Sequence, residues 1–513
     1  MGVGREYAAR PYTDLHQLTH VRLSLAQVLE MGFARDALSE IAVASLTGQR
    51  AHPVPLPRYP LAYTPSIAER LDQLPLTRLH VAILAICSGA FAFDLLEVAL
   101  GGALSAVFSA PPHRIDGSQL SHLIAAVYIG AIFGSPLLGW LADRFGRKRL
   151  LIAAVWWLAS TSTAMAVREN IAWLTTIRLL AGLSIGAFPP LMFTYLTEVL
   201  PPRRRGMSIL VLSAVSTAGV PLGLLFLRWL TNIQPLGVEA WRWLFAITGL
   251  GASLAGMMLR FIPESPRWLI GVGHTLAAEA ACRTFEGSRV LERVGPALAP
   301  MPIPEGSRAI VDTDRGGWNR TLLGRYRSPL ILAAALYFLS PWATVAFPLL
   351  SGPTLIAKGV SLGDTFGYLA LATFGQLTGS VLAAMFIDRI ERRTAIVLCA
   401  FLMALSALVF ALESSPIFVI GSNVAFGTFS GMFIPVLSVY VTELFSTRIR
   451  SSATSSTWAF NRIGSALAIL MLVPVLRQRG AIPAFDIMAG TLLIDIAILT
   501  IFGQRGLARR SVD

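Results

Sequence analysis

Charged residues and cysteines are both scarce in this sequence. Only 14% of the 513 residues are Asp, Glu, Lys or Arg, whereas 54% are hydrophobic, and the mean hydropathy is +0.64. Soluble domains contain about 25% charged residues, so this composition excludes an ordinary soluble protein and predicts a polytopic membrane protein. The three cysteines, Cys87, Cys282 and Cys399, show neither a disulfide framework nor the spacing of a metal site.

The sequence also lacks the motifs of an enzyme or an ATPase. No Gly-x-x-x-x-Gly-Lys-Ser/Thr phosphate loop occurs, and no nucleophile–base pattern is present. His16 and His20 have the spacing of a metal pair, but Gln17 stands where a metalloprotease needs glutamate. We therefore expect no enzymatic activity, no metal and no cofactor. The net charge of +13 lies largely in short loops, where it sets membrane topology, so we expect no nucleic-acid partner.

A cluster of charges separates two long apolar runs at residues 139–149. The runs at 121–141 and 150–167 can each cross about 30 Å of hydrocarbon as a helix, and they lack the polar faces of a soluble helix–turn–helix. Charges are costly in lipid, so the cluster is predicted to be an interfacial turn, on the cytoplasmic side because it is basic. Its glycine and charged residues are Gly139, Asp143, Arg144, Gly146, Arg147, Lys148 and Arg149.

The cluster has a second copy 245 positions further along the chain, at residues 388–393. The same offset relates Gly130 and Gly134 to Gly375 and Gly379, and it relates further residues across about 75 positions. This constant offset indicates two structural copies of one half. We expect the glycines to let neighbouring helices approach closely. The further matched pairs are Gly182 and Gly427, Gly186 and Gly431, Pro190 and Pro435, Tyr195 and Tyr440, Glu198 and Glu443, Arg203 and Arg448, and Arg205 and Arg450.

Hydropathy predicts twelve membrane spans, six in each copy. We expect one six-helix bundle at 77–262 and a second at 328–505, separated by a cytoplasmic central loop at 263–327. Because the number of spans is even and the basic connections share one face, both termini are expected in the cytoplasm, although Arg477 and Arg479 lie on the other face. The predicted spans are near 80–105, 119–141, 149–167, 171–197, 206–231, 241–262, 329–356, 365–387, 394–413, 416–442, 451–474 and 482–504.

The two ends of the chain are expected to lie outside the membrane. Residues 1–76 form an extension that is not a signal peptide, because charged residues interrupt any apolar core. Most of it is interpreted either as a disordered tail or as the product of a miscalled start, with Met31 as an in-frame alternative. Ser66 and Glu69 form a predicted capping box that opens a short surface helix. Residues 506–513 form a short cytoplasmic tail.

These motifs resemble those of the major facilitator superfamily. The turn at 139–149 is similar to that superfamily's loop between helices 2 and 3, and Asp388–Arg393 is similar to its second copy. Arg178–Gly186, Tyr195–Gly206 and Pro263–Leu269 resemble its motifs in helix 4, after helix 4 and after helix 6. The resemblance implies an all-α membrane protein with twelve transmembrane helices in two six-helix bundles related by pseudo-two-fold symmetry. We expect a monomer in the lipid bilayer of the cell inner membrane.

Two further segments favour the metabolite:proton symporter branch, which is similar to the sugar porters. Ile67–Pro75 precedes the first predicted span, and Phe93–Glu97 lies within it. Ser446 and Ser451 depart from the motif between helices 10 and 11, which usually has proline and glycine there, so the geometry of that turn is in doubt.

The resemblance also implies a gating role for charges at the helix ends. Asp143 would brace helix 11 across the cytoplasmic gap, and Glu198 and Glu443 would form networks with Arg203, Arg205, Arg448 and Arg450. In the alternative interpretation these charges are solvated and only set topology. The predicted gating set comprises Gly139, Asp143, Arg144, Gly146, Arg147, Lys148, Glu198, Arg203, Arg205, Glu264, Arg267, Asp388, Arg389, Arg392, Glu443, Arg448 and Arg450.

Three charged residues fall inside predicted spans of the first half. Asp94 and Arg178 both lie about 20 Å from the cytoplasmic surface at 1.5 Å per residue, and Glu97 lies one turn further out. An unpaired charge there costs about 2.5–3.5 kcal/mol, so we expect Asp94 to pair with Arg178 and to take up a proton. A static ion pair, or Glu97 as the proton carrier, are the alternatives. The second copy lacks these charges, because the offset of 245 leads to Leu339, Trp342 and Asn423.

Arg462, beside Asn461 in predicted helix 11, has no obvious acid in its own half. A buried guanidinium of this kind suits a substrate carboxylate, and a contact with helix-end carbonyl groups is the alternative. The full set of predicted substrate-binding residues is Tyr128, Tyr337, Trp342, Gln376, Asn423, Asn461 and Arg462.

The sequence therefore favours a secondary transporter that works by alternating access. The expected substrate is a small organic metabolite, with a carboxylate as the favoured class, taken up together with protons. A proton-driven exporter of drugs or metabolites and a sugar or polyol symporter are the alternatives among transporters. A solute sensor that binds without transporting is the alternative from another class.

Overall fold

A computed structural model describes residues 66–288, 327–386, 390–445 and 450–504. The chain divides into a unit at 1–64 and a unit at 65–513, and all described residues belong to the second. The predictions for the N-terminal extension, for most of the central loop and for Asp388, Arg389, Ser446 and Arg448 lie outside the described residues. Ser451 and Arg450 lie in a described helix, but their side chains are also outside the description.

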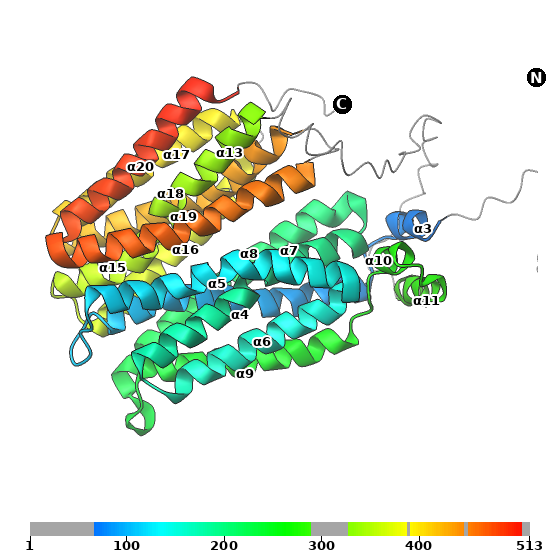
Figure 1. The fold of residues 1–513 in the computed structure, drawn as a ribbon, viewed down its shortest axis with the longest axis horizontal. Coiled ribbons are helices and arrows are strands. Elements are labelled where there is room, and N and C mark those ends of the chain that lie inside the picture. The colour runs from blue at the N-terminus through cyan, green and yellow to red at the C-terminus, as the bar shows by residue number, and fades with distance from the viewer. Residues whose placement is uncertain (1–65, 289–326, 387–389, 446–449, 505–513) are drawn as a thin grey trace, which may run out of the picture. The chain divides into compact units, whose positions relative to one another are not determined.

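The described part of the chain contains helices and no strands, and it has twelve helices long and apolar enough to cross a membrane (Figure 1). The sequence-based prediction of twelve spans is therefore confirmed. The N-terminal bundle consists of α4 (Arg78–Val107), α5 (Gly117–Phe145), α6 (Arg147–Val167), α7 (Ile171–Val199), α8 (Pro202–Ile233) and α9 (Ala240–Met258). The C-terminal bundle consists of α13 (Arg327–Leu339), α14 (Pro341–Thr344), α15 (Ala346–Ala357), α16 (Leu362–Phe386), α17 (Arg392–Leu412), α18 (Pro416–Glu443), α19 (Arg450–Arg479) and α20 (Ala481–Phe502).

The seventh span differs from its prediction because it is not one continuous helix. It is divided into α13, α14 and α15 between Arg327 and Ala357. Pro341 begins α14, and proline lacks the backbone N–H that a continuous helix would need at this position. The interruption brings Thr344, Val345 and neighbouring residues of α15 to the wall of a central cavity.

Three pairs of helices make most of the contact between the two bundles in the described part of the chain. Helix α4 packs against α15, α5 against α19, and α8 against α16. In Figure 1 helices α5 and α19 lie close together at one end of the molecule and diverge toward the end where the short helices α10 (Pro266–Gly271) and α11 (Thr275–Glu286) lie. Small residues allow the close approach: a Cβ atom at Gly102 of α4 would lie 3.0 Å from the carbonyl oxygen of Pro348 in α15. The interface between the bundles is therefore built from backbone as well as side-chain contacts.

The offset of 245 is also present in the packing of the helices, which confirms the predicted role of the glycines. A Cβ at Gly130 of α5 would overlap the Leu179 carbonyl oxygen of α7, and a Cβ at Gly375 of α16 would meet the Val424 oxygen of α18. Leu179 and Val424 are themselves 245 positions apart. The same holds for three other pairs of contacts, which are Gly134 with Leu183 and Gly379 with Thr428, Gly182 with Val127 and Gly427 with Ala372, and Gly186 with Ala131 and Gly431 with Gln376.

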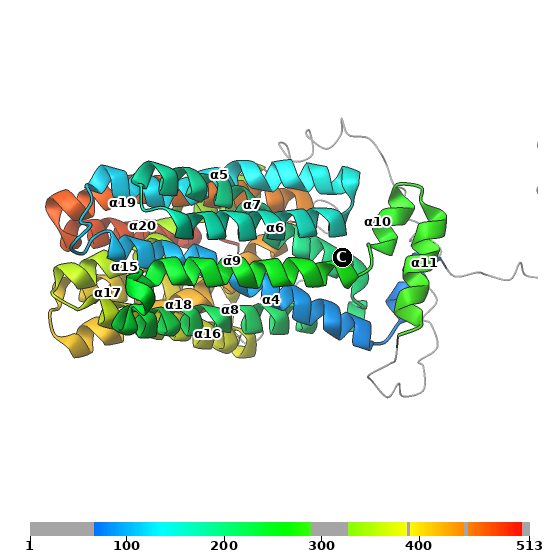
Figure 2. The ribbon, with the colours of Figure 1, turned by 90° about the horizontal axis from the view of Figure 1, so that it is seen from below.

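Three short helices lie beyond one end of the spanning helices (Figure 2). They are α3 (Ile67–Gln73), α10 (Pro266–Gly271) and α11 (Thr275–Glu286). The predicted capping box is present, because Ser66 accepts a hydrogen bond from the Glu69 backbone and Glu69 accepts one from Ser66. Arg70 of α3 donates to Glu279 and Glu286 of α11, and these hydrogen bonds hold the pKa of both carboxyls below the usual glutamate value. We call this end of the molecule, where α5 turns into α6, the basic end.

Candidate functional site

The most deeply buried ion pair joins α4 to α7 within the N-terminal bundle. Glu97 and Arg178 are 0% and 1% exposed, and Arg178 Nη1 lies 3.4 Å from Glu97 Oε1. The same nitrogen donates to the Glu97 backbone carbonyl at 3.1 Å, and Ser162 of α6 donates to Glu97 Oε2 at 2.6 Å. Gly101 makes room for the guanidinium, since a Cβ there would lie 2.8 Å from Arg178 Nη2. Both charges are therefore compensated inside one bundle.

The expected pair of Asp94 with Arg178 is not present, because Glu97 takes the place of Asp94. One turn along α4 separates the two acids, and the guanidinium engages both the backbone and the side chain of Glu97. Asp94 is 1% exposed, and its Oδ1 has no hydrogen-bond partner within the described residues. At least one oxygen of this buried carboxyl group therefore makes no hydrogen bond with the described residues.

Arg462 of α19 is partly buried, and its Nε has no hydrogen-bond partner within the described residues. The Arg462 guanidinium also lies 5.7 Å from the ring centre of Trp458 on its own helix. The sequence predicted that Arg462 has no acid in its own half, and within the described residues Arg462 forms no ion pair.

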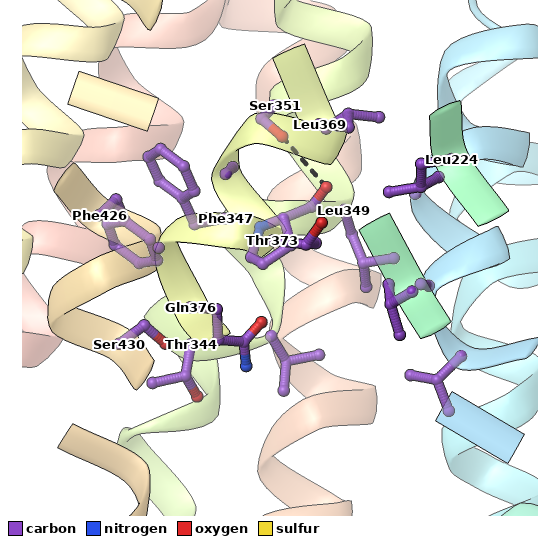
Figure 3. A pocket seen from close by; sticks show the side chains of 18 of the residues that line it. Leu224, Thr344, Phe347, Leu349, Ser351, Leu369, Thr373, Gln376, Phe426 and Ser430 are labelled. Atoms are coloured by element: carbon purple, nitrogen blue, oxygen red, sulfur yellow. Dashed lines mark hydrogen bonds between the residues drawn. The ribbon is translucent and has the colours of Figure 1, made fainter. Parts of the chain in front are cut away.

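A cavity of about 230 Å³ lies between the bundles (Figure 3). It is lined by residues of α4, α5 and α8 on one side and of α14, α15, α16 and α18 on the other, and none of them is Asp, Glu, Lys or Arg. Phe347 and Phe426 stack with ring centres 3.7 Å apart, and Figure 3 shows Thr344, Gln376 and Ser430 grouped together. This wall offers hydroxyl, amide and aromatic groups to a ligand. Its polar side chains are Tyr128, Thr217, Thr344, Ser351, Thr373, Gln376, Asn423 and Ser430.

The cavity includes three of the seven predicted substrate-binding residues, namely Tyr128, Gln376 and Asn423. Tyr337, Trp342, Asn461 and Arg462 do not line it. The ring of Tyr337 instead packs edge-on against Trp458 at 5.2 Å, which is a contact between α13 and α19.

Sequence reasoning missed the serine and threonine hydroxyl groups of the cavity wall, although the repeat contained a signal for two of them. The offset of 245 leads from Tyr128 to Thr373, and both line the cavity. It also leads from Arg178 to the lining residue Asn423, and from Arg462 to the lining residue Thr217.

The predicted gating charges at the basic end form contacts that repeat between the bundles. Arg147 Nε lies 3.4 Å from Glu198 Oε1, and Arg392 Nε lies 3.5 Å from Glu443 Oε1. Both residues of one pair are 245 positions from those of the other. Arg147 also pairs with Asp143 at 2.5 Å. Arg147, the first residue of α6, therefore links the charged turn to Glu198 at the end of α7. In the second bundle Arg392, the first residue of α17, makes the equivalent contact with Glu443 at the end of α18.

The partner of Glu198 differs from the prediction, whereas the predicted partners of Glu443, Arg448 and Arg450, lie outside the described side chains. Arg203 is exposed, while Arg205 donates to the Leu200 carbonyl at 3.2 Å and lies 4.0 Å from Asp72. Neither arginine pairs with Glu198. The cation that contacts Glu198 is Arg147, at the start of α6, and not an arginine at the start of α8. The sequence could not indicate which of several nearby arginines faces the acid.

The remaining motif residues hold the charged turn against the helices that follow the sixth span. Glu264 accepts a hydrogen bond from the Lys148 backbone at 2.9 Å, and its side chain lies where a Cβ at Gly146 would be. Gly146 has φ of +112°, a conformation that favours glycine. Arg267 pairs with Asp72 of α3. The guanidinium of Arg144 lies near aromatic rings of its own helix.

Two polar contacts join the bundles at the end opposite the basic end. Arg228 of α8 pairs with Asp364 of α16 at 3.0 Å, and Gly367 leaves space for the guanidinium. Arg477 of α19 donates to Ser109 Oγ, just after α4, at 2.9 Å. Arg477 was predicted to lie on the face opposite the basic connections, against the general distribution of Lys and Arg. Its hydrogen bond to Ser109 gives it a structural role at that end.

The twelve spans, the repeated glycine contacts and the central cavity define the major facilitator fold. The chain belongs to the sugar (and other) transporter family, whose model matches residues 81–504. It is a multi-pass membrane transporter and not an enzyme.

Named relatives match most of the chain. The putative metabolite transport protein YyaJ of Bacillus subtilis is 27% identical over 86% of this chain and 96% of its own length. The arabinose-proton symporter of the same organism is 24% identical over 79% of this chain and 88% of its own length.

Solved structures show the same fold. The partially occluded inward-open structure of the xylose transporter XylE from E. coli matches with a TM-score of 0.66 and 18% identity, over 83% of this chain and 98% of that chain. A crystal structure of a D-xylose-proton symporter matches with a TM-score of 0.62 and 20% identity, over 83% of this chain and 98% of that chain.

Proposed function

We propose that this chain is a proton-coupled transporter that takes up a small, uncharged, polyhydroxylated metabolite by alternating access. The observation that carries this proposal is the uncharged cavity, with hydroxyl and amide groups on its wall, beside a separate cluster of buried charges. Hydroxyl and amide groups can donate and accept hydrogen bonds with substrate hydroxyls, whereas a charged wall would suit an ionised substrate. The names of relatives that are pentose–proton symporters support the same class.

We assign the proton to Asp94. Its Oδ1 has no partner among the described side chains, whereas Glu97 already accepts a hydrogen bond from Ser162 and a contact from Arg178. A carboxyl group in a low-dielectric site is neutralised readily when its charged form lacks hydrogen bonds. Glu97 and Arg178 then act as a fixed pair that keeps the site preorganised.

The basic end is assigned to the cytoplasm, because Lys and Arg concentrate in its connections. The contacts of Arg228 and Arg477 then hold the two bundles together on the outer side. In this assignment the cavity is closed from outside, and rocking of the bundles would exchange these contacts for contacts at the basic end.

A carboxylate remains a second candidate substrate, supported by the balance of charge in this region. Asp94, Glu97 and Arg178 are buried and Arg462 is partly buried, so two acids offset two guanidinium groups when both acids are ionised. Protonation of Asp94 would leave one cation in excess beside the cavity, which would favour an anion that enters with the proton.

The substrate class is tested with purified protein and a panel of pentoses, hexoses, polyols, hydroxy acids and aromatic acids. We expect thermal stabilisation by a neutral polyol or sugar, and accumulation of that compound in vesicles when a pH gradient is imposed. Stabilisation by acids alone would establish the carboxylate candidate. Accumulation that ignores the pH gradient would reject proton coupling, and proton flux opposite to the substrate would indicate an exporter.

A further inference from the structure

The wall of the central cavity is polar on the side of the C-terminal bundle and largely apolar on the side of the N-terminal bundle. Six of its eight polar side chains belong to α14, α15, α16 and α18, which are all elements of the C-terminal bundle. Figure 3 shows Thr344, Gln376 and Ser430 together on one side of the cavity, with Leu224 of α8 on the far side. A ligand in this cavity therefore meets two chemically different walls.

The apolar wall is formed by one face of α4 and one face of α8. In each helix the lining residues have the spacing of positions on one side of a helix. The acids Asp94 and Glu97 of α4 fall outside this set and do not line the cavity. The lining residues are Leu95, Val98, Ala99 and Gly102 of α4, and Thr217, Val220 and Leu224 of α8.

This wall offers carbon surface and little hydrogen bonding to a ligand. Leu95 and Val98 are partly exposed where they line the cavity, so their surface is not fully covered by packing. Tyr128 and Thr217 are the two polar lining residues of the N-terminal bundle, and the Thr217 hydroxyl donates to the Ser213 carbonyl of its own helix at 2.8 Å. Ligand hydroxyls that face α4 and α8 would therefore find few partners.

The opposite wall has groups with unused hydrogen-bonding capacity. Within the described residues, neither the Gln376 amide nor the Ser430 hydroxyl takes part in a hydrogen bond. The Thr344 hydroxyl donates to the Ser340 carbonyl at 3.0 Å and can still accept a hydrogen bond. One amide and two hydroxyl groups therefore stand together, able to donate to and accept from several ligand hydroxyls.

The internal repeat indicates that this difference between the walls is not dictated by packing. The two copies pack alike, as the repeated glycine contacts show. Three polar lining residues of the second copy nevertheless have apolar counterparts in the first, so the fold accepts either kind of side chain at these positions. The pairs, each 245 positions apart, are Thr344 and Ala99, Gln376 and Ala131, and Ser430 and Ile185.

Walls of this kind discriminate between ligands by the hydroxyl groups that become buried. A hydroxyl held against Val98, Val220 and Leu224 loses its hydrogen bonds with water and gains none in return. An apolar group in the same place removes apolar surface from water, which is favourable. An added hydroxyl in an apolar pocket weakens binding by up to about 100-fold.

We propose that the transported metabolite is amphipathic, with hydroxyl groups along one edge and a deoxygenated or alkylated face opposite. This inference rests on the proposed uptake of a neutral, polyhydroxylated compound and narrows its class. The hydroxyl edge contacts Thr344, Gln376 and Ser430, and the apolar face contacts Val98 and Leu224. A deoxy sugar, an alkyl glycoside or a methylated cyclitol has this pattern, whereas a fully hydroxylated sugar does not.

The test compares matched ligands on the purified full-length protein by isothermal titration calorimetry. The probes are D-glucose, D-xylose and myo-inositol, each with its series of monodeoxy and mono-O-methyl derivatives. We expect at least one derivative to bind about tenfold or more tightly than its parent, because its altered carbon lies against the apolar wall. A parent that binds at least as tightly as every one of its derivatives, in all three series, would overturn the inference.

Variants of the two walls locate the preference. L224N introduces a polar side chain of similar size and should reduce the gain to less than about threefold, whereas L224M keeps the wall apolar and should retain the gain. S430A, on the opposite wall, should weaken the binding of parent and derivative to the same extent. V98T provides the comparison if L224N does not fold. An unchanged gain in the polar variants would overturn the assignment of the apolar face to this wall.

The outcomes distinguish the failure of this inference from that of the proposed function. Binding of the parent compounds without a gain for any derivative would overturn the amphipathic class and leave the uptake of a neutral polyol or sugar intact. Binding of acids alone, or of no neutral compound, would overturn the proposed substrate class and this inference with it.

Discussion

The Arg178 guanidinium contacts Glu97 twice, through the backbone carbonyl at 3.1 Å and through the side-chain carboxylate at 3.4 Å. Both side chains are almost completely inaccessible. Breaking a buried pair by removing one partner leaves the other charge uncompensated, at a cost of about 3–5 kcal/mol. The pair is therefore a structural requirement of the N-terminal bundle.

Replacement of Arg178 by alanine should lower the thermal stability of the purified protein by an amount that corresponds to about 3–5 kcal/mol. The double variant E97Q/R178M should recover most of the loss, because it leaves no buried charge. Arg168→Ala, at an exposed arginine, is the control and should melt as the parent does. An R178A protein with unchanged melting would show that Glu97 is not held by this cation.

The repeated glycine contacts predict equivalent effects in the two bundles. Gly130→Ala and Gly375→Ala should each destabilise the protein by about 1–3 kcal/mol, because the added methyl group meets a backbone oxygen of the neighbouring helix. Gly139→Ala is a matched control, since nothing lies within 4 Å of a Cβ at that position. Thermal unfolding in detergent measures the difference. Equal melting of all three variants would contradict the close helix approach.

The contact between Arg228 and Asp364 should favour the conformation in which the bundles meet at the end opposite the basic end. Both side chains are about half exposed, so the pair contributes on the order of 0.2–1 kcal/mol. Arg228→Ala should shift the ratio of conformations by at most about fivefold, read from spin labels at Leu236 and Ile417. The charge-exchanged variant R228D/D364R should restore the parent ratio. Failure of the exchange to restore it would indicate that the pair is solvated and has no latching role.

The cavity wall predicts a selective effect of Asn423. Asn423→Leu removes a polar lining group, so the apparent KM for the compound that stabilises the protein most should rise by about two- to tenfold, as for the loss of one hydrogen bond. Tyr337→Phe is the comparison, because Tyr337 lies outside the cavity, and its KM should stay unchanged. Vesicle uptake at a fixed pH gradient gives both values. Equal KM values in the two variants would place the substrate elsewhere.

The architecture was predictable from sequence because its signals are long or repeated. Twelve apolar runs specified the spans, and the offset of 245 specified which glycines approach neighbouring backbones. The capping box at Ser66 was equally clear, because it depends only on residues three positions apart. In each case the determining residues are close in the sequence or share one spacing.

The charge pairs were predicted less well, because hydropathy gives the depth of a residue but not its direction around the helix axis. Asp94 and Glu97 differ in depth by one turn, and only the packed structure shows which of them faces Arg178. The guanidinium of Arg462 lies over Trp458 four positions before it on the same helix, a contact that depends on side-chain orientation. The threonines of the cavity wall were missed because a hydroxyl inside an apolar helix is usually satisfied by its own backbone.

The most direct test of the proton site compares two modes of transport in vesicles that contain Asp94→Asn. The variant should lose accumulation driven by a pH gradient, because its amide cannot take up and release a proton, and should keep substrate counterflow, which needs no net proton movement. Glu97→Gln is the comparison and should retain some gradient-driven accumulation. Full gradient-driven accumulation by the Asp94→Asn protein would contradict the account.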